Sequence, residues 1–149
     1  MPRPLSEQVV VVTGASSGIG REAARMLGRR GASVVLMARD EAMLHEVAAE
    51  VEAAGGQALV AAADVSDAAQ VLQAADRAAA HFGRIDTWVN NAGIATYGTV
   101  EQTTVEEMRR VVEVDLLGTI HGTKTALPHL RQSGGTLINV ASVAGRLPV

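Results

Sequence analysis

The chain has 149 residues, of which 48% are hydrophobic and only 2% aromatic, so the core of a single domain would be built from Val, Ala, Leu and Ile. Its formal net charge is −3, with 13 basic and 16 acidic side chains and no basic patch, which argues against binding to nucleic acid or to an anionic membrane. It contains no cysteine, which excludes disulfides, thiolate metal ligands and cysteine nucleophiles, and no metal site is predicted.

The N-terminal residues give no sign of a targeting segment. The first eight residues are too short and too polar for a signal peptide, and no apolar run approaches the roughly 20 residues that span a bilayer. The absence of cysteine is compatible with a reducing compartment. We therefore expect a soluble cytoplasmic protein with no membrane partner.

Apolar runs and helical periodicities alternate along the whole chain. Short apolar runs predict five strands, at residues 9–12, 34–37, 58–62, 88–89 and 136–140. Helical spacing of apolar residues predicts the intervening helices, at 19–27, 43–51, 71–82 and about 104–131. In the first of these helices the recurring apolar residues are Ile19, Ala23, Met26 and Leu27. This alternation predicts one α/β domain, a Rossmann-type doubly wound parallel sheet between two layers of helices.

A glycine-rich turn, TGASSGIG, lies directly between the first strand and the first helix. Gly14 would allow a sharp exit from the strand, Gly18 a close approach of ligand to backbone, and Gly20 tight packing of helix on sheet. Ser16 and Ser17 could cap the helix and donate hydroxyls to a phosphate. The spacing predicts a pyrophosphate site, and no Gly-Lys-Ser/Thr follows that would make it a P-loop. The alternative is a strand–helix turn that binds no ligand.

Three further segments stand at strand ends: Asp-Val at 64–65, Asn-Asn-Ala-Gly at 90–93 and Asn-Val-Ala-Ser at 139–142. Together with the glycine turn, and in this order and spacing, they make the chain resemble the short-chain dehydrogenase/reductase family in its classical subgroup. The resemblance runs from about residue 7 to the last residue. It implies a nicotinamide dinucleotide cofactor and a small alcohol or carbonyl substrate, bound at the carboxyl ends of the strands.

The resemblance also assigns roles to individual positions. It implies that the pyrophosphate and the nearby ribose are held by Gly14, Ser16, Ser17, Gly18, Ile19 and Gly20. Asp64 would accept a hydrogen bond from the adenine amino group, beside the backbone of Val65, and Asn90 would brace the centre of the sheet. The ribose and nicotinamide side would be lined by Asn91, Ala92 and Gly93. Alternatively, Asp64 could cap the third helix, and both asparagines could be turn residues alone.

The end of the second strand bears on the choice between NADP and NAD. An acidic residue at this place accepts from the ribose 2′-hydroxyl of NAD, whereas an arginine favours the 2′-phosphate of NADP. This chain has Ala38 and then Arg39, and Asp40 is predicted to cap the second helix. NADP(H) is therefore preferred over NAD(H), with a solvated loop charge as the alternative for Arg39.

The proton-transfer residues are only partly represented. In the family a tyrosine with a lysine four residues later, assisted by a serine and an asparagine, handles the proton at the substrate oxygen. Here Tyr97 is followed at that distance by Glu101, and Lys124 is preceded by Ile120, so the 149 residues contain no Tyr-x-x-x-Lys. The catalytic Tyr and Lys are thus absent, and we expect this chain alone to be inactive.

The other two members of the catalytic set have candidates. The resemblance implies that Ser142 hydrogen-bonds the substrate oxygen. Asp115 occupies the place of the usual asparagine, but a carboxylate cannot donate as an amide does, so a helical-surface aspartate is an equal alternative.

The sequence therefore leaves two main hypotheses. One is the cofactor-binding part of an NADP-dependent oxidoreductase, a single domain over residues 1–149 that is incomplete at its C-terminus and leaves the strand at 136–140 as an exposed edge. The family resemblance further implies that the full-length form is a homo-oligomer that pairs through the helix at about 112–130. The other hypothesis is a non-catalytic NADP(H)-binding module. A third class, the methyltransferases, usually has an acidic residue at the end of the second strand to bind a ribose. Ala38 and Arg39 stand there in this chain, which argues against that class.

Overall fold

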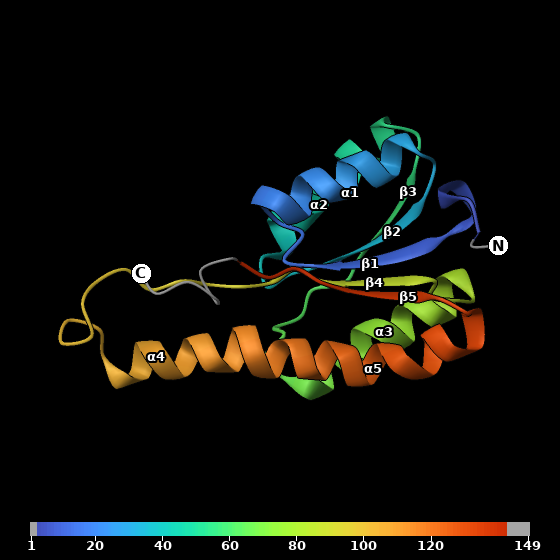
Figure 1. The fold of residues 1–149 in the computed structure, drawn as a ribbon. Coiled ribbons are helices and arrows are strands. Elements are labelled where there is room, and N and C mark those ends of the chain that lie inside the picture. Colours follow the sequence, from blue (N-terminus) through green and yellow to red (C-terminus); the bar gives the residue numbers. More distant parts are fainter. Residues whose placement is uncertain (1–2, 143–149) are drawn as a thin grey trace.

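The computed structural model describes residues 3–142 as a parallel sheet between two layers of helices (Figure 1). The strands are β1 (Val9–Thr13), β2 (Ser33–Met37), β3 (Gln57–Val60), β4 (Thr87–Asn90) and β5 (Thr136–Asn139). Their spatial order is β3-β2-β1-β4-β5, with every neighbouring pair parallel. The predicted Rossmann-type sheet is confirmed, with strand ends shifted by one or two residues from the apolar runs.

The helices divide between the two faces of the sheet. Above it in Figure 1 lie α1 (Gly18–Arg29) and α2 (Glu41–Ala53); below it lie α3 (Ala68–Phe82), α4 (Val105–Val111) and α5 (Gly118–Ser133). A short 3-10 turn, η1 (Leu5–Glu7), precedes β1, and a π-helical turn, η2 (Val112–Leu117), connects α4 to α5. Each parallel connection therefore crosses over through a helix, as parallel strands require.

The central strand β1 is buried on both faces of the sheet. Val9 and Val11 belong to the core on the α3 and α5 side, which also contains Trp88. Val10 and Val12 belong to the separate core under α1 and α2. Because successive side chains of a strand point to opposite faces, a continuous run of valines supplies both cores at once.

Helix α1 buries only part of its recurring apolar residues, because Leu27 packs against the core under α1 and α2 while two others are exposed. Ile19 is 72% exposed and Met26 is 55% exposed, whereas the buried side of the helix carries Gly20, Ala24 and Gly28. The reason is the close approach of α1 to its neighbours: a Cβ on Gly28 would lie 2.8 Å from the carbonyl oxygen of Val51 in α2. Large side chains do not fit into this contact, so they point away from it.

The predicted long helix over 104–131 is three consecutive segments. The chain turns helically from α4 through the π-helical η2 into α5, which continues to Ser133 and contains Pro128. The buried side of α5 is again a row of mostly small residues, Gly118, Gly122, Ala126 and Leu130. Apolar periodicity does not distinguish a single π-helical turn from the α-helix on either side of it, so η2 was not predicted.

Strand β5 is the outer strand on one side of the described sheet. It pairs with β4 through the register Thr87↔Thr136 to Asn90↔Asn139, and only Leu137 in it is partly buried. Ile138 and, just beyond the strand, Val140 are each 44% exposed. The exposed apolar edge expected from the sequence is thus observed in the described chain.

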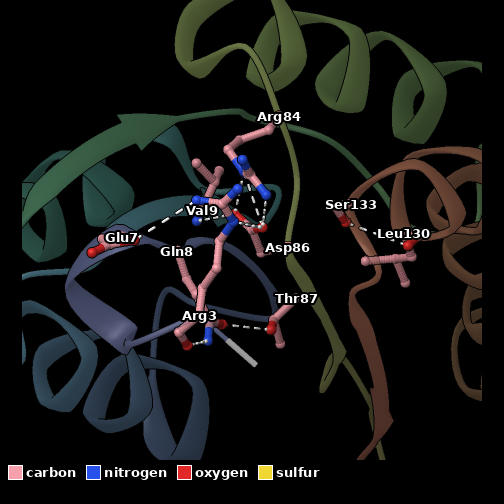
Figure 2. A network of polar contacts seen from close by, with 9 residues as sticks. All are labelled: Arg3, Glu7, Gln8, Val9, Arg84, Asp86, Thr87, Leu130 and Ser133. Atoms are coloured by element: carbon pink, nitrogen blue, oxygen red, sulfur yellow. Dashed lines mark hydrogen bonds and ion pairs between the residues drawn. The ribbon is translucent and has the colours of Figure 1, made fainter. Parts of the chain in front are cut away.

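A buried carboxylate fixes the amino ends of β1 and β4 (Figure 2). Asp86 is only 5% exposed and precedes β4 directly. Its Oδ2 accepts from the backbone N–H of Val9 at 3.0 Å, and Nε of Arg84 donates to both of its carboxylate oxygens at 2.9 and 3.0 Å. Arg3 adds a weaker contact at 4.0 Å. The carboxylate therefore ties two central strands at the edge opposite to their carboxyl ends.

We expect Asp86→Asn to lower the free energy of unfolding by about 2 kcal/mol, because hydrogen bonds to a charged group contribute about 1.5–3 kcal/mol. Urea denaturation followed by circular dichroism measures this change. Glu22→Gln is the control, since Glu22 pairs with Arg25 and Arg29 on the exposed surface of α1 and should matter little. Equal effects of the two substitutions would contradict a special role of the buried carboxylate.

Candidate functional site

A cavity of about 700 Å³ opens at the carboxyl ends of the strands. This volume falls within the range of small-molecule and cofactor pockets. All the residues that the sequence assigns to a dinucleotide line it, apart from Gly20. The lining residues are Gly14, Ser16, Ser17, Gly18, Ile19, Ala38, Arg39, Asp40, Ala63, Asp64, Val65, Asn91, Ala92, Gly93, Ile94, Arg110 and Val114.

The glycines of the turn after β1 serve two purposes. A Cβ on Gly14 would lie 2.8 Å from Cα of Ala92, and a Cβ on Gly20 would overlap the carbonyl oxygen of Gly14, so the protein's own packing requires both. Gly18 is different: its φ is +54°, and a Cβ there would meet nothing within 4 Å. Gly18 thus leaves backbone open to the cavity at the start of α1, where free N–H groups favour an anion.

Ser17 does not cap α1 with its side chain. It occupies the N-cap position, with extended backbone angles, but its hydroxyl makes no capping hydrogen bond. The expectation that serine hydroxyls cap this helix is therefore wrong for Ser17. Ser17 and Ser16 both line the cavity instead.

The hydroxyl of Thr13 joins the ends of β1 and β4. Thr13 is 2% exposed, and its Oγ1 accepts from the backbone N–H groups of Asn91 at 2.9 Å and of Ala92 at 3.0 Å. In return, Nδ2 of Asn91 donates to the carbonyl oxygens of Thr13 at 2.9 Å and of Gly14 at 3.4 Å. The glycine turn and the segment after β4 are thus held as one unit on the cavity wall.

Asn90 braces the middle of the sheet, as expected. Its Nδ2 donates to Oδ1 of Asn139 in β5 at 2.9 Å and to Oγ1 of Thr123 in α5 at 3.2 Å. Its own Oδ1 accepts from Nε1 of Trp88 at 2.8 Å. A Cβ on Gly122 would overlap this Oδ1, so the glycine lets α5 approach the network. The side chain is 4% exposed and serves the sheet rather than the cavity.

Asp64 lies in a hydrogen-bonded cluster at the β3 end of the cavity. Its Oδ1 accepts from the backbone N–H of Ser66 at 2.9 Å and from the Ser66 hydroxyl at 2.7 Å, and its Oδ2 accepts from Nη2 of Arg110 at 2.7 Å. Burial by itself would raise the pKa of Asp64, but the hydrogen bonds from Ser66 and Arg110 outweigh burial and hold the pKa below its ordinary value. The carboxylate is therefore ionised and oriented.

The alternative role of Asp64, capping the third helix, is wrong. The cap of α3 is Asp67, whose Oδ1 accepts from the backbone N–H groups of Ala69 at 2.9 Å and Gln70 at 3.2 Å. Asp64 instead forms the turn that leads to it, since the N–H of Asp67 donates to the Asp64 carbonyl oxygen. The carboxylate of Asp64 is left to face Ser66, Arg110 and the cavity.

Arg110 is the site residue that the sequence did not reveal. It lies in α4, 46 positions after the aspartate that it contacts, and it lines the cavity with Asp64. Its Nη1 also donates to the Ser66 hydroxyl at 2.7 Å. Helical periodicity placed it in a helix, but no local pattern indicates a contact over this separation.

Arg39 lies beside the cavity at the start of α2. Asp40 caps that helix as predicted, because its Oδ1 accepts from the backbone N–H of Met43 at 3.1 Å. Arg39 lines the cavity, is exposed, and among residues 3–142 has neither a hydrogen-bond nor an ion-pair partner. Its guanidinium is therefore available to an anionic group in the cavity.

The two catalytic candidates lie outside the cavity lining. Ser142 is exposed and is the third residue after β5. Asp115 lies in η2, where its Oδ1 accepts from the backbone N–H of Ile94 at 2.9 Å and its carbonyl oxygen accepts from the hydroxyl of Thr119 at 2.8 Å. Asp115 thus supports the loop after β4, and its catalytic role, like that of Ser142, stays a prediction.

The comparison with known proteins gives a consistent answer. Residues 8–149 match the family model for short chain dehydrogenases. Over 145 residues the chain is 43% identical to the uncharacterized oxidoreductase YxnA of Bacillus subtilis strain 168, a match that covers 96% of this chain and 41% of that protein. Over 138 residues it is 40% identical to meso-2,3-butanediol dehydrogenase of Serratia marcescens, covering 93% of this chain and 54% of that one.

A solved structure is similar over the whole chain. It is a metagenomic short-chain oxidoreductase in complex with NADP, 40% identical, with a TM-score of 0.91. The match covers 99% of this chain and 67% of that protein. The chain spans about half the length of the curated relatives that it matches.

We expect Thr13→Val to lower the free energy of unfolding by about 2–4 kcal/mol, because it leaves two backbone N–H groups without an acceptor at almost unchanged volume. Thr119→Val is the matched control. It removes only a hydroxyl donor to the Asp115 carbonyl and should cost less than about 1 kcal/mol. Urea denaturation of both variants measures the difference, and a harmless Thr13→Val would mean that other contacts hold the two strand ends.

Proposed function

Because this chain belongs to the short-chain dehydrogenase/reductase family, we propose that it forms the dinucleotide-binding part of an oxidoreductase that uses NADP(H) to interconvert small alcohols and carbonyls. The observation that carries this proposal is the cavity at the carboxyl ends of the strands, with the bare backbone of Gly18 on its wall. Parallel α/β sheets bind ligands at this edge.

The lining residues fit a dinucleotide along the length of the cavity. The open backbone at Gly18, with the helix dipole of α1 behind it, suits a pyrophosphate. Asp64 offers a carboxylate acceptor to an adenine amino group, and Asn91, Ala92 and Gly93 lie along the opposite side, for the ribose and nicotinamide. When bound, the nicotinamide would supply or accept the hydride, while the chain's own residues bind and orient.

The preference for NADP(H) rests on charges at the end of β2. The methyl side chain of Ala38 cannot accept a hydrogen bond from a ribose hydroxyl, and the carboxylate of Asp40 accepts the capping hydrogen bond of α2. The guanidinium of Arg39 has no partner among the described residues and lines the cavity. A 2′-phosphate would give it one, through charge-assisted hydrogen bonds that arginine forms well.

Arg39→Asp tests this cofactor preference. We expect the Kd for NADPH to rise by about 10–100-fold, because the change removes a cation and adds repulsion, while the Kd for NADH changes by less than about threefold. Fluorescence titration with each reduced cofactor gives both constants.

Arg131→Asp is the control for this experiment. It changes the net charge equally but lies in the last turn of α5, away from the cavity lining. It should leave both affinities unchanged. Equal losses of NADPH and NADH affinity in Arg39→Asp would contradict the 2′-phosphate assignment.

A second candidate function is a non-catalytic NADP(H)-binding module. It is favoured because the 149 residues contain no Tyr-x-x-x-Lys pair for proton transfer. Tyr97 is 95% exposed in the loop after β4, and Lys124 is exposed on α5. They lie 27 positions apart, so within the 149 residues they form no Tyr-x-x-x-Lys pair.

We therefore expect the 149-residue chain to bind NADPH without oxidising it in the presence of ketones, aldehydes or diketones. Absorbance at the nicotinamide band, recorded with saturating cofactor, measures this directly. Binding without turnover fits both candidate functions, which the intact mass of the native protein separates: a mass above 15.4 kDa favours the oxidoreductase, and 15.4 kDa favours the module. Sustained NADPH consumption by the short chain would overturn our assignment of the catalytic pair.

Two broader expectations belong to the same proposal. No helix within residues 3–142 is long and apolar enough to cross a membrane. We propose a cytoplasmic protein that binds small molecules and other copies of itself, and that has no nucleic-acid or membrane partner. The homo-oligomer of the full-length form, paired through α5, is likewise a prediction from the family resemblance.

A further inference from the structure

We propose that Arg110 determines the base specificity of the cavity: by orienting the Asp64 carboxylate it makes the site select a 6-amino purine over a 6-oxo purine. This inference rests on the proposed dinucleotide function and assigns a role to a residue that contacts the base only through another side chain. Arg110 is thus a positioning residue.

The carboxylate of Asp64 is held from two directions. Ser66 approaches Oδ1 with its backbone N–H and its hydroxyl, both from the same turn after β3. Arg110 approaches Oδ2 from α4, and its second terminal nitrogen reaches the Ser66 hydroxyl. The guanidinium therefore bridges the aspartate and the serine, which fixes the plane of the carboxylate relative to the cavity.

The number of hydrogen bonds leaves room for one more partner. An ionised carboxylate offers about four lone-pair positions, and three of these are taken by two donors from Ser66 and one from Arg110. A carboxylate accepts and cannot donate. The remaining position therefore suits the amino group of adenine and is repelled by the carbonyl oxygen that hypoxanthine carries at the same place.

Both terminal nitrogens of Arg110 contact protein groups. Nη2 donates to Asp64 and Nη1 to Ser66, and Nη1 also lies 3.5 Å from Oε2 of Glu113. The guanidinium is thus held in place by Asp64, Ser66 and Glu113. Lysine could not reproduce this arrangement, because an ammonium is a single point charge without the planar fork of arginine.

The neighbouring residue on the same helix provides a matched control. Arg109 is exposed and does not line the cavity, and its side chain has no hydrogen-bond or ion-pair partner within residues 3–142. Arg109→Met and Arg110→Met therefore remove the same charge from the same helix, but only the second removes a contact with Asp64.

The experiment compares the Kd of NADPH with that of its hypoxanthine analogue, reduced nicotinamide hypoxanthine dinucleotide phosphate, by fluorescence titration. We expect the parent chain and Arg109→Met to prefer NADPH by about tenfold or more, and Arg110→Met to prefer it by less than about threefold. Arg110→Lys should give an intermediate preference, and it keeps the test usable if thermal unfolding shows that the methionine variant does not fold.

A second comparison separates positioning from packing. In an Asp64→Asn background, where the side chain can both donate and accept, Arg110→Met should not change the base preference further. A base preference in Arg110→Met equal to that of the parent would overturn the proposal, as would equal losses of affinity for both dinucleotides. If the parent chain binds NADPH and the hypoxanthine analogue equally well, the base-specificity proposal fails but the proposed dinucleotide function stands. If the parent chain binds neither dinucleotide, both the base-specificity proposal and the proposed function fail.

Discussion

The hydroxyl of Thr13 receives two backbone N–H groups from the segment that follows β4, and the arrangement of the cavity depends on this contact. β1 delivers the glycine turn, and β4 delivers the cavity residues Asn91, Ala92 and Gly93 directly beside it. Without a link between the two strand ends, nothing in this contact would fix the position of one segment relative to the other. The amide of Asn91 completes the link by returning hydrogen bonds to the carbonyls of Thr13 and Gly14. The carboxylate of Asp86 performs the corresponding task at the other end of the same two strands.

Close packing of helices on the sheet is the second constraint, and it explains the composition of the chain. Where α1 and α5 face their neighbours, the contact residues are mainly glycine and alanine, spaced by four. Bulk comes from the strands instead, in the valines of β1 and in Trp88. A core with so few aromatic residues is thus compatible with dense packing, because backbone approaches backbone.

Much of the fold could be predicted because its signals are local. The valine run of β1, the glycine turn and the cap at Asp40 each depend on residues close in sequence. The apolar spacing that predicted α1 does not identify its buried side, because glycine and alanine occupy most of that side; of these, only Gly20 was expected to pack on the sheet. Arg110 was missed for a different reason: its partner lies 46 residues away, on another element, and only the folded chain brings them together. The positions of Gly18 and Arg39 on the cavity wall needed the structure, although their residue types suggested a ligand.

The π-helical turn η2 acts on the rotational phase of the helices that it joins. Arg110 and Gly118 are eight residues apart, and in an unbroken α-helix they would be turned by about 80° relative to each other. The wider π-helical turn contains one additional residue, which offsets this rotation by about 100°, so the Arg110 side chain and the bare Cα of Gly118 face the same side of the helix. There Arg110 binds Asp64 and Ser66, while Gly118 packs against Val65 between them. A deletion within 112–117 would therefore act through rotation as well as through the residue lost: it would turn Arg110 away from the side of the helix that carries Gly118, and the two could no longer both face the segment that follows β3.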